Sequence, residues 1–147
     1  EYIGNLCEYC HWSIEYYNPA SRVKPDTPRS FRNINVSHNI LRKGGYGWGS
    51  VGRESESALF NSFGVTPNTE KFEAHDNIFD RSAGHLVRLC KGGDEKLIAS
   101  GNTFIQKNGR AFGFCYGETY AFTKKTAEKC AKEFFHDSEP RIIFSEA

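Results

Sequence analysis

The sequence predicts an all-β protein, a right-handed parallel β-helix solenoid of about four coils with a helical cap at its C-terminal end. A short motif recurs along the chain, and segments of alternating apolar and polar residues flank it at a constant phase. The pattern then stops, and apolar residues at helical spacing replace it. These observations divide the chain into β-helix coils at residues 1–117 and a cap at residues 118–147.

The recurring motif is Asn, any residue, then an apolar residue. Its four copies are Asn5-Leu6-Cys7, Asn39-Ile40-Leu41, Asn77-Ile78-Phe79 and Asn102-Thr103-Phe104. An alternating segment precedes three copies, with apolar residues five and three positions ahead of the Asn, as at Phe72 and Ala74. A second alternating segment follows about ten residues after the Asn. The residues expected to face inward on this second strand are Ile14 and Tyr16, Val87 and Leu89, and Phe112 and Phe114.

The copies differ in length, and the shortest separates Asn77 from Asn102. The longer copies require insertions, which we expect at residues 18–29 and 53–69 because Pro, Gly, Ser and Asn are frequent there. In the copy at Asn39, the second strand is expected near residues 48–51, although its glycines leave the register open. Strands that recur at one phase pair in parallel, and parallel crossovers are nearly always right-handed.

The repeated Asn has a physical role in such a stack. At a bend, its amide can donate to one neighbour and accept from the next, which satisfies polar atoms that would otherwise be buried without partners. This pattern resembles the Asn ladders of the pectate-lyase-like β-helix family, and the resemblance covers about residues 2–117. An ordinary β-sandwich in which the short motif recurs by chance is the alternative.

The resemblance implies a carbohydrate-active protein, either a polysaccharide lyase or a glycoside hydrolase, secreted or on the cell surface. The chain lacks Met and starts in an apolar stretch. We therefore expect a C-terminal portion that contributes sugar contacts, with polysaccharide or oligosaccharide and the upstream coils of the same parent protein as partners. The alternative function is a noncatalytic β-helix used for adhesion or carbohydrate binding.

The expected cap begins where the repeat ends. Apolar residues at helical spacing, with Thr123 as the N-cap, predict a helix over about residues 123–135. The run Ile142-Ile143-Phe144 predicts a short final strand. A solenoid needs such a cap because its last coil would otherwise expose backbone groups and core.

Charge and hydropathy exclude several partners. The chain has 19 Lys and Arg against 18 Asp and Glu, so no global field attracts nucleic acid or anionic lipid. No apolar run is long enough for a membrane-spanning helix, and no signal peptide is recognisable. We expect no nucleic-acid partner and no membrane span.

The five cysteines leave several readings open. Cys7, Cys10 and His11 match the c-type haem attachment pattern or a partial zinc site, although the repeat already explains Cys7 as a core residue. Cys90 and Cys115 are expected to match in adjacent coils, as stacked thiols or as a disulfide. The reading we favour is reduced, mostly buried thiols with no cofactor and no metal.

Sugar binding calls for aromatic faces beside polar groups. Trp12 and Tyr46 each lie seven residues after a repeated Asn, Trp48 is close by, and the inserted loops follow. The predicted substrate-binding residues are Trp12, Tyr46, Trp48, Arg53 and Glu54.

The catalytic candidates follow from residue type alone, because no spacing among them is diagnostic of one reaction. A lyase needs a base and a cation such as calcium or Arg beside the uronate, whereas a hydrolase needs two carboxyl groups. The side chains that could serve these roles are Glu15, Asp76, Asp80 and Arg88.

Overall fold

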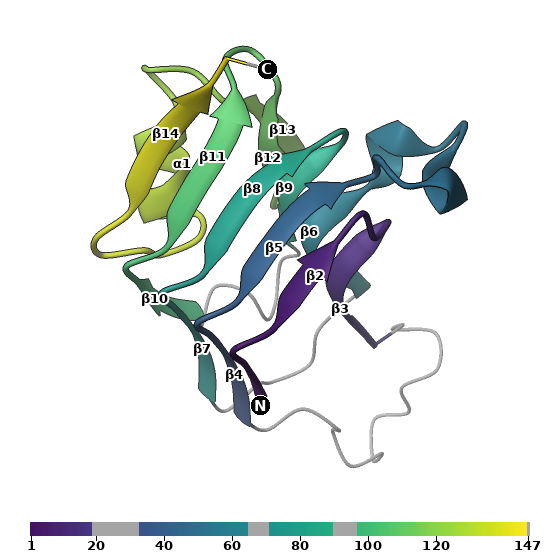
Figure 1. Ribbon diagram of the computed structural model, residues 1–147. Coiled ribbons are helices and arrows are strands. Elements are labelled where there is room, and N and C mark those ends of the chain that lie inside the picture. The colour runs from purple at the N-terminus through teal and green to yellow at the C-terminus, as the bar shows by residue number, and fades with distance from the viewer. Residues whose placement is uncertain (19–32, 65–70, 90–96, 147) are drawn as a thin grey trace.

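The structure is a computed structural model that describes residues 1–18, 33–64, 71–89 and 97–146. Most of this part of the chain is strand, arranged in three sheets (Figure 1). The first sheet has the order β1-β4-β7-β10, formed by Tyr2–Ile3, Asn33–Ser37, Lys71–His75 and Leu97–Ser100. The second has the order β14-β11-β8-β5-β2, formed by Arg141–Ser145, Thr103–Lys107, Ile78–Ser82, Ile40–Gly44 and Leu6–Glu8. The third has the order β13-β12-β9-β6-β3, formed by Glu118–Ala121, Ala111–Cys115, His85–Leu89, Ala58–Gly64 and Trp12–Asn18.

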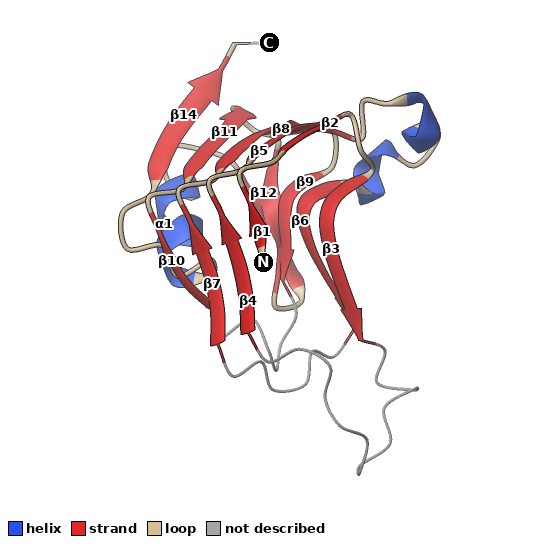
Figure 2. Cartoon of the chain, turned by 60° about the horizontal axis from the view of Figure 1, so that its bottom comes forward, coloured by secondary structure: helices blue, strands red, loops and turns tan. Residues whose placement is uncertain are grey.

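Each copy of the sequence repeat contributes one strand to each sheet. Strands from successive copies are neighbours and run parallel, and the only antiparallel pair among the described strands is β12 with β13. In the second sheet, the residues that follow the repeated Asn pair in register, with Ile40 between Leu6 and Ile78. The parallel pairing of the repeats predicted from the sequence is confirmed, and Figure 2 shows β4, β7 and β10 side by side.

The repeated asparagines form a continuous hydrogen-bonded ladder. The Nδ2 group of Asn5 donates to Oδ1 of Asn39 at 3.1 Å, and the same bond joins Asn39 to Asn77 and Asn77 to Asn102, each at 2.9 Å. Each Oδ1 also accepts the backbone N–H of the preceding Asn. At the end of the row, Oδ2 of Asp137 accepts from Nδ2 of Asn102 at 2.8 Å. The ladder is therefore a structural element of the bend, as predicted.

A tight backbone conformation precedes every position of the ladder. The five preceding residues have φ between 55° and 70°, in the left-handed region, and they are Gly4, His38, Asp76, Gly101 and His136. At Gly101 a Cβ atom would lie 2.3 Å from Oδ1 of Asp76, so a larger residue here would have to displace that carboxylate. The left-handed residue turns the chain so that the next side chain, the Asn, points into the stack.

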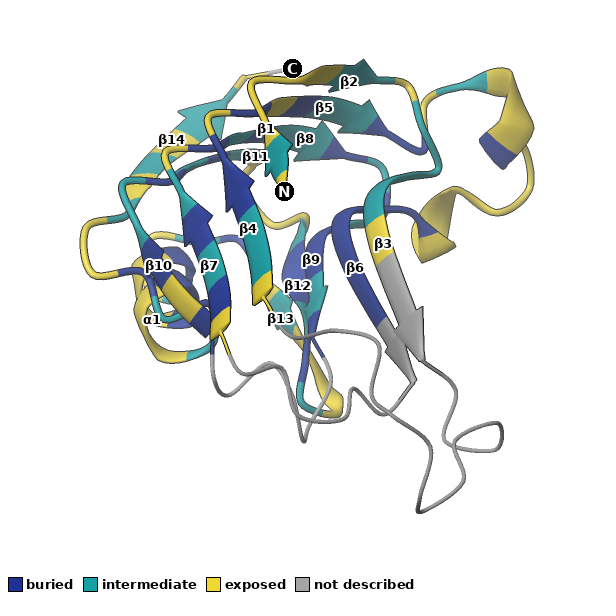
Figure 3. Ribbon diagram, turned by 90° about the horizontal axis from the view of Figure 1, so that it is seen from below, coloured by how far each residue is buried: buried dark blue, intermediate teal, exposed yellow. Residues whose placement is uncertain are grey.

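The core is shared by all three sheets and is rich in phenylalanine. Phe72, Phe79 and Phe60 come from the first, second and third sheets, and all three are fully buried. Phe135 meets Phe60 and Phe79 edge to face, each with ring centroids 5.5 Å apart. Figure 3 shows buried positions on strands of every sheet. Burial of one such ring stabilises the fold by roughly 1.5–3 kcal/mol.

The C-terminal elements close one end of the sheets. Helix α1 spans Ala127–Glu133, inside the predicted range 123–135 but shorter, because Thr126 rather than Thr123 is the N-cap residue. Thr126 makes no side-chain cap hydrogen bond, whereas Thr123 accepts the backbone N–H of Thr126 through its Oγ1 at 3.2 Å, which is the kind of capping contact expected of it. The predicted final strand is present as β14, which pairs in parallel with β11.

The predicted insertion at residues 53–69 is wrong over residues 58–64, and residues 65–69 lie outside the described residues. Residues 58–64 form β6, whose Leu59 and Phe60 are fully buried, and this is the second strand of the copy at Asn39. Residues 48–51, where that strand was expected, contain the short 3₁₀ helix η2, Trp48–Ser50. The extra residues lie instead at 45–57, a segment that projects from the stack (Figure 1). This projecting segment contains η2 and a second 3₁₀ helix, η3, Glu54–Glu56. The other predicted insertion, residues 18–29, falls almost wholly outside the described residues.

The expected register of the last copy is also wrong by one residue. Cys115 pairs with Leu89, and Phe114 pairs with Arg88 on the outer face. β11 pairs with β8 at an offset of 25 residues and β12 pairs with β9 at an offset of 26, so one extra residue lies between the paired parts of β11 and β12. Phe114 therefore does not face the core with Phe112, and Cys115 does not match Cys90, whose own placement lies outside the described residues.

No helix in the described ranges has the length and apolar character needed to cross a membrane.

We expect Asn77→Ala to lower the free energy of unfolding by about 1–3 kcal/mol, because it leaves ladder partners buried without hydrogen bonds. Asn77 is fully buried and bonds to Asn39, Asn102 and the carbonyl of Val36. Asn5→Ala is the matched control, since Asn5 is exposed at the end of the ladder. Urea denaturation measures both. Equal losses for the two variants would contradict a graded, buried ladder.

Candidate functional site

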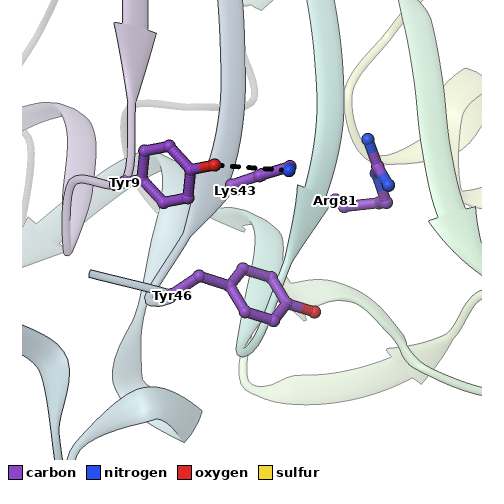
Figure 4. A pocket seen from close by; sticks show the side chains of 4 residues that line it. All are labelled: Tyr9, Lys43, Tyr46 and Arg81. Atoms are coloured by element: carbon purple, nitrogen blue, oxygen red, sulfur yellow. Dashed lines mark hydrogen bonds between the residues drawn. The ribbon is translucent and has the colours of Figure 1, made fainter. Parts of the chain in front are cut away.

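A pocket of about 250 Å³ opens where the second sheet meets the segment that follows β5. Its walls are Tyr9, Lys43, Tyr46 and Arg81. Figure 4 shows Lys43 extending between Tyr9 and Arg81, with the ring of Tyr46 on the other side of the space. Two aromatic rings and two cationic side chains thus share one hollow.

The phase of the repeat places three of these side chains in a row. Tyr9, Lys43 and Arg81 each lie four residues after a ladder Asn. All three have left-handed backbones, with φ of 59°, 54° and 59°. The strands that carry or precede them, β2, β5 and β8, are parallel neighbours. A second bend in each of the first three copies therefore directs successive side chains to one place on the surface.

Glycines on both sides of Tyr46 allow its segment to approach β2. The N–H of Gly45 donates to the carbonyl of Cys10 at 2.9 Å, and Gly45 has a φ of 78°. At Gly47 a Cβ atom would lie 2.3 Å from the carbonyl oxygen of Tyr9, so only glycine fits. These contacts hold the ring of Tyr46 beside the row formed by the other three residues.

The pocket carries two positive charges, one of which is paired. Nζ of Lys43 donates to the Tyr9 hydroxyl at 3.3 Å and lies 5.5 Å from the centroid of that ring. Arg81 donates from Nε to Asp80 at 2.7 Å, and this hydrogen bond raises the pKa of the guanidinium further above its usual value. An anionic group that enters the pocket would meet both Lys43 and the Arg81 side chain.

The structure separates the aromatic residues that the sequence grouped together. Trp12 pairs with Ala58, so the prediction that Trp12 and Tyr46 occupy one phase is wrong. The indole of Trp12 is half-buried and donates to the carbonyl of Glu56 at 3.1 Å. Trp48 lies on η2 with 93% of its surface exposed, outside the pocket lining.

The charged residues predicted for sugar binding lie on the projecting segment. Arg53 forms an ion pair with Glu56 at 3.0 Å. Glu54 accepts the N–H of Gly52 at 3.1 Å, and backbone hydrogen bonds lower the pKa of its carboxyl group. Neither Arg53 nor Glu54 lines the pocket, although both lie on the same projecting segment as Tyr46.

The catalytic candidates are spread over several elements. Glu15 lies on β3 and accepts from Asn61 at 3.3 Å, whereas Asp76 lies at the ladder bend, 3.9 Å from His38. Asp80 is held by Arg81, and the Arg88 guanidinium lies 6.0 Å from the ring centroid of Phe114. Among the described residues, no group of three or more His, Cys, Asp or Glu side chains is placed to hold a metal ion.

Comparisons with protein-family models, curated proteins and solved structures find no match. Sequence reasoning identified Tyr46 but missed Tyr9 and Lys43, and it named neither those residues nor Arg81 as sugar contacts. Their signal was the constant spacing after each repeated Asn.

One half-buried histidine outside the pocket has a perturbed pKa. His85 begins β9, and its Nδ1 atom is buried without a hydrogen-bond partner in the described structure. Burial, assisted by the positive charge of Arg88, lowers its pKa from 6.5 to about 4. The neutral imidazole is thus the form that fits the fold.

We expect His85 to make the protein less stable as the pH falls from about 6.5 towards about 4. The folded-state pKa lies below the unfolded one, so the unfolded chain binds the proton first in this window, whereas above it both states are neutral and the stability is complete. Urea denaturation at pH 7 and pH 5 measures the loss, and His85→Gln should reduce it. His38→Gln, at a side chain with 66% exposure, is the control. A pH dependence that His85→Gln leaves intact would assign the effect to other groups.

Proposed function

We propose that the three sheets form a right-handed parallel β-helix of the pectate-lyase-like type and that this chain binds an acidic oligosaccharide as part of a carbohydrate-active protein. The observation that carries the proposal is the pocket in which Tyr9 and Tyr46 stand with Lys43 and Arg81. The strand orders and the Asn ladder support the fold.

The side chains of the pocket suit a sugar that bears a carboxylate. A pyranose ring presents C–H bonds on its face, which pack on the aromatic rings of Tyr9 and Tyr46. Its carboxylate can receive hydrogen bonds from Lys43 and Arg81, and charge-assisted bonds of this kind are stronger than neutral ones. Neutral sugars would gain the stacking but not the ionic contacts.

The dimensions of the pocket set the expected affinity. A volume of about 250 Å³ is below the usual range of ligand sites, roughly 300–1,000 Å³, so one or two sugar units fill it. Stacking on each ring contributes on the order of 1 kcal/mol. We therefore expect dissociation constants near about 1 mM for short oligosaccharides.

The pocket favours a lyase or a binding protein over a hydrolase. Both oxygens of Asp80, the carboxylate beside the pocket, accept hydrogen bonds from Arg81, at 2.7 and 3.2 Å. Hydrolysis calls for two carboxyl groups that flank the bond, whereas β-elimination calls for a base and a cation near the uronate. A noncatalytic carbohydrate-binding or adhesion role is the second candidate, and absence of any unsaturated product from a bound oligouronide would favour it.

The exposed edge of the sheets suggests a second partner. β1, β2 and β3 are outer strands, and Ile3 and Leu6 on them are 46% and 60% exposed. Open parallel edges of this kind can accept further strands. We propose that upstream coils of the same parent protein pair here, and slower amide hydrogen exchange at Leu6–Glu8 in a longer chain would support this.

We expect Tyr46→Ala to weaken the binding of a uronic-acid trisaccharide about tenfold, the equivalent of about 1.4 kcal/mol. Lys43→Gln should lower the affinity for the acidic trisaccharide and leave the affinity for a neutral trisaccharide of the same length unchanged, because only the ionic contact is lost. NMR titration or calorimetry measures both affinities.

Two control variants test where this ligand binds. Trp48→Ala changes an exposed ring outside the pocket. Lys125→Gln removes a lysine from a separate hollow of about 540 Å³ near β14, lined also by Asn108, Thr123, Lys124 and Phe144. Neither should change the affinity. If Trp48→Ala abolishes binding and Tyr46→Ala does not, the ligand binds at the exposed Trp48 ring and the pocket is not the site.

A further inference from the structure

Two cysteines flank the bend that carries Tyr9. The Sγ atoms of Cys7 and Cys10 lie 3.0 Å apart, and both residues are half-buried and free. A disulfide bond is about 2.05 Å long, so the sulfur atoms need to move only about 1 Å closer. The other described cysteines, Cys115 and Cys130, are buried.

His11, which follows Cys10 directly, is hydrogen-bonded to another element. Nδ1 of His11 forms a hydrogen bond with Oγ of Ser50 at 2.8 Å, and Ser50 is buried on η2. Besides the Sγ atom of Cys7, the Sγ atom of Cys10 has the carbonyl oxygen of Glu8 at 3.5 Å. The two thiols thus face each other within one bend, while His11 fastens β3 to the projecting segment.

We propose that Cys7 and Cys10 form a reversible disulfide that fixes the bend and thereby sets the shape of the pocket. A low-molecular-weight disulfide such as glutathione disulfide is the oxidant. One cysteine thiolate attacks it and releases a glutathione thiolate, and the second cysteine then displaces the other glutathione from the mixed disulfide. Two protein thiols lose their protons and two electrons, and one glutathione disulfide becomes two glutathione molecules.

The bend is coupled to both aromatic walls of the pocket. Tyr9 lies between the two cysteines, and its N–H donates to the carbonyl of Arg42 at 3.2 Å. The carbonyl of Cys10 accepts from Gly45, next to Tyr46, and Gly47 sits against the carbonyl of Tyr9. A cross-link across residues 7–10 therefore restrains Tyr9 directly and Tyr46 through its hydrogen-bonded segment.

The chemistry of the thiols favours a slow, stable link over a catalytic dithiol. The hydrogen bond with Cys7, followed by burial, raises the pKa of Cys10 to about 11. Catalytic thiols have depressed pKa values because the thiolate is the attacking species. Exchange at Cys10 is therefore slow at neutral pH, as suits a bond that persists while conditions stay oxidising.

The test begins with the cross-link itself and does not depend on any sugar. The full chain is incubated in glutathione buffers of increasing oxidised fraction, quenched with acid, alkylated and mapped by peptide mass spectrometry. We expect a Cys7–Cys10 link, with a mass decrease of about 2 Da, as the main intramolecular disulfide. Cys115→Ala should retain it, and Cys7→Ser should abolish it. Mixed pairings like those of the urea-unfolded chain, or no Cys7–Cys10 link, would overturn the proposal.

The second part measures the coupling, which for ligand binding rests on the proposed function. Oxidation should slow amide hydrogen exchange at residues 8–11 and 45–47 and raise the affinity for a uronic-acid trisaccharide about threefold to tenfold. The variant with Cys7→Ser and Cys10→Ser should show neither response. If no sugar binds but exchange slows, the proposed function fails and the link stands. Unchanged exchange in the oxidised protein would refute control of the pocket.

Discussion

The hydrogen bond from the side-chain amide of one Asn to that of the next is the interaction on which the remaining structure depends. It fixes the vertical alignment of every copy of the repeat, because a shift by one residue would leave both an amide and a backbone N–H buried without partners. The second bend follows the Asn by the same number of residues in the first three copies, so it inherits this alignment. Tyr9, Lys43 and Arg81 consequently stand in a row although they are far apart in sequence.

The ladder also determines how the stack can end. An Asn in the final position would need another acceptor beyond it, whereas a carboxylate accepts without donating. Asp137 meets this requirement, since one of its oxygens accepts both the backbone N–H and the Nδ2 group of Asn102. Its other oxygen accepts the N–H of Glu139, which turns the chain towards β14. The same segment brings Phe135 into the core, so polar and apolar groups close the stack together.

Periodicity revealed the repeats, the parallel pairing and the ladder, because those follow from residue type at fixed spacing. It failed at β6, where Asn61 and Ser62 are buried within the strand and disguise it as a loop. It failed again at Phe114, because one extra residue between β11 and β12 shifts the register and cannot be seen in an alternating pattern. In the pocket, Tyr46 was found through its separation from Asn39 along the sequence. Tyr9 and Lys43 were missed because neither residue type signals a left-handed bend. Only the three-dimensional stack brings them together.

Backbone strain offers an independent reason to regard the pocket as a site. A left-handed backbone costs a residue other than glycine roughly 1–2 kcal/mol, and Asn, Asp and His tolerate it best. The ladder bend follows this preference, with Gly4, His38 and Asp76 in the successive copies. The second bend does not, because Tyr, Lys and Arg occupy its left-handed positions where Gly would be less strained. Such strain tends to persist where the side chain has a use. All three side chains line the pocket, which is the contribution that glycine could not make.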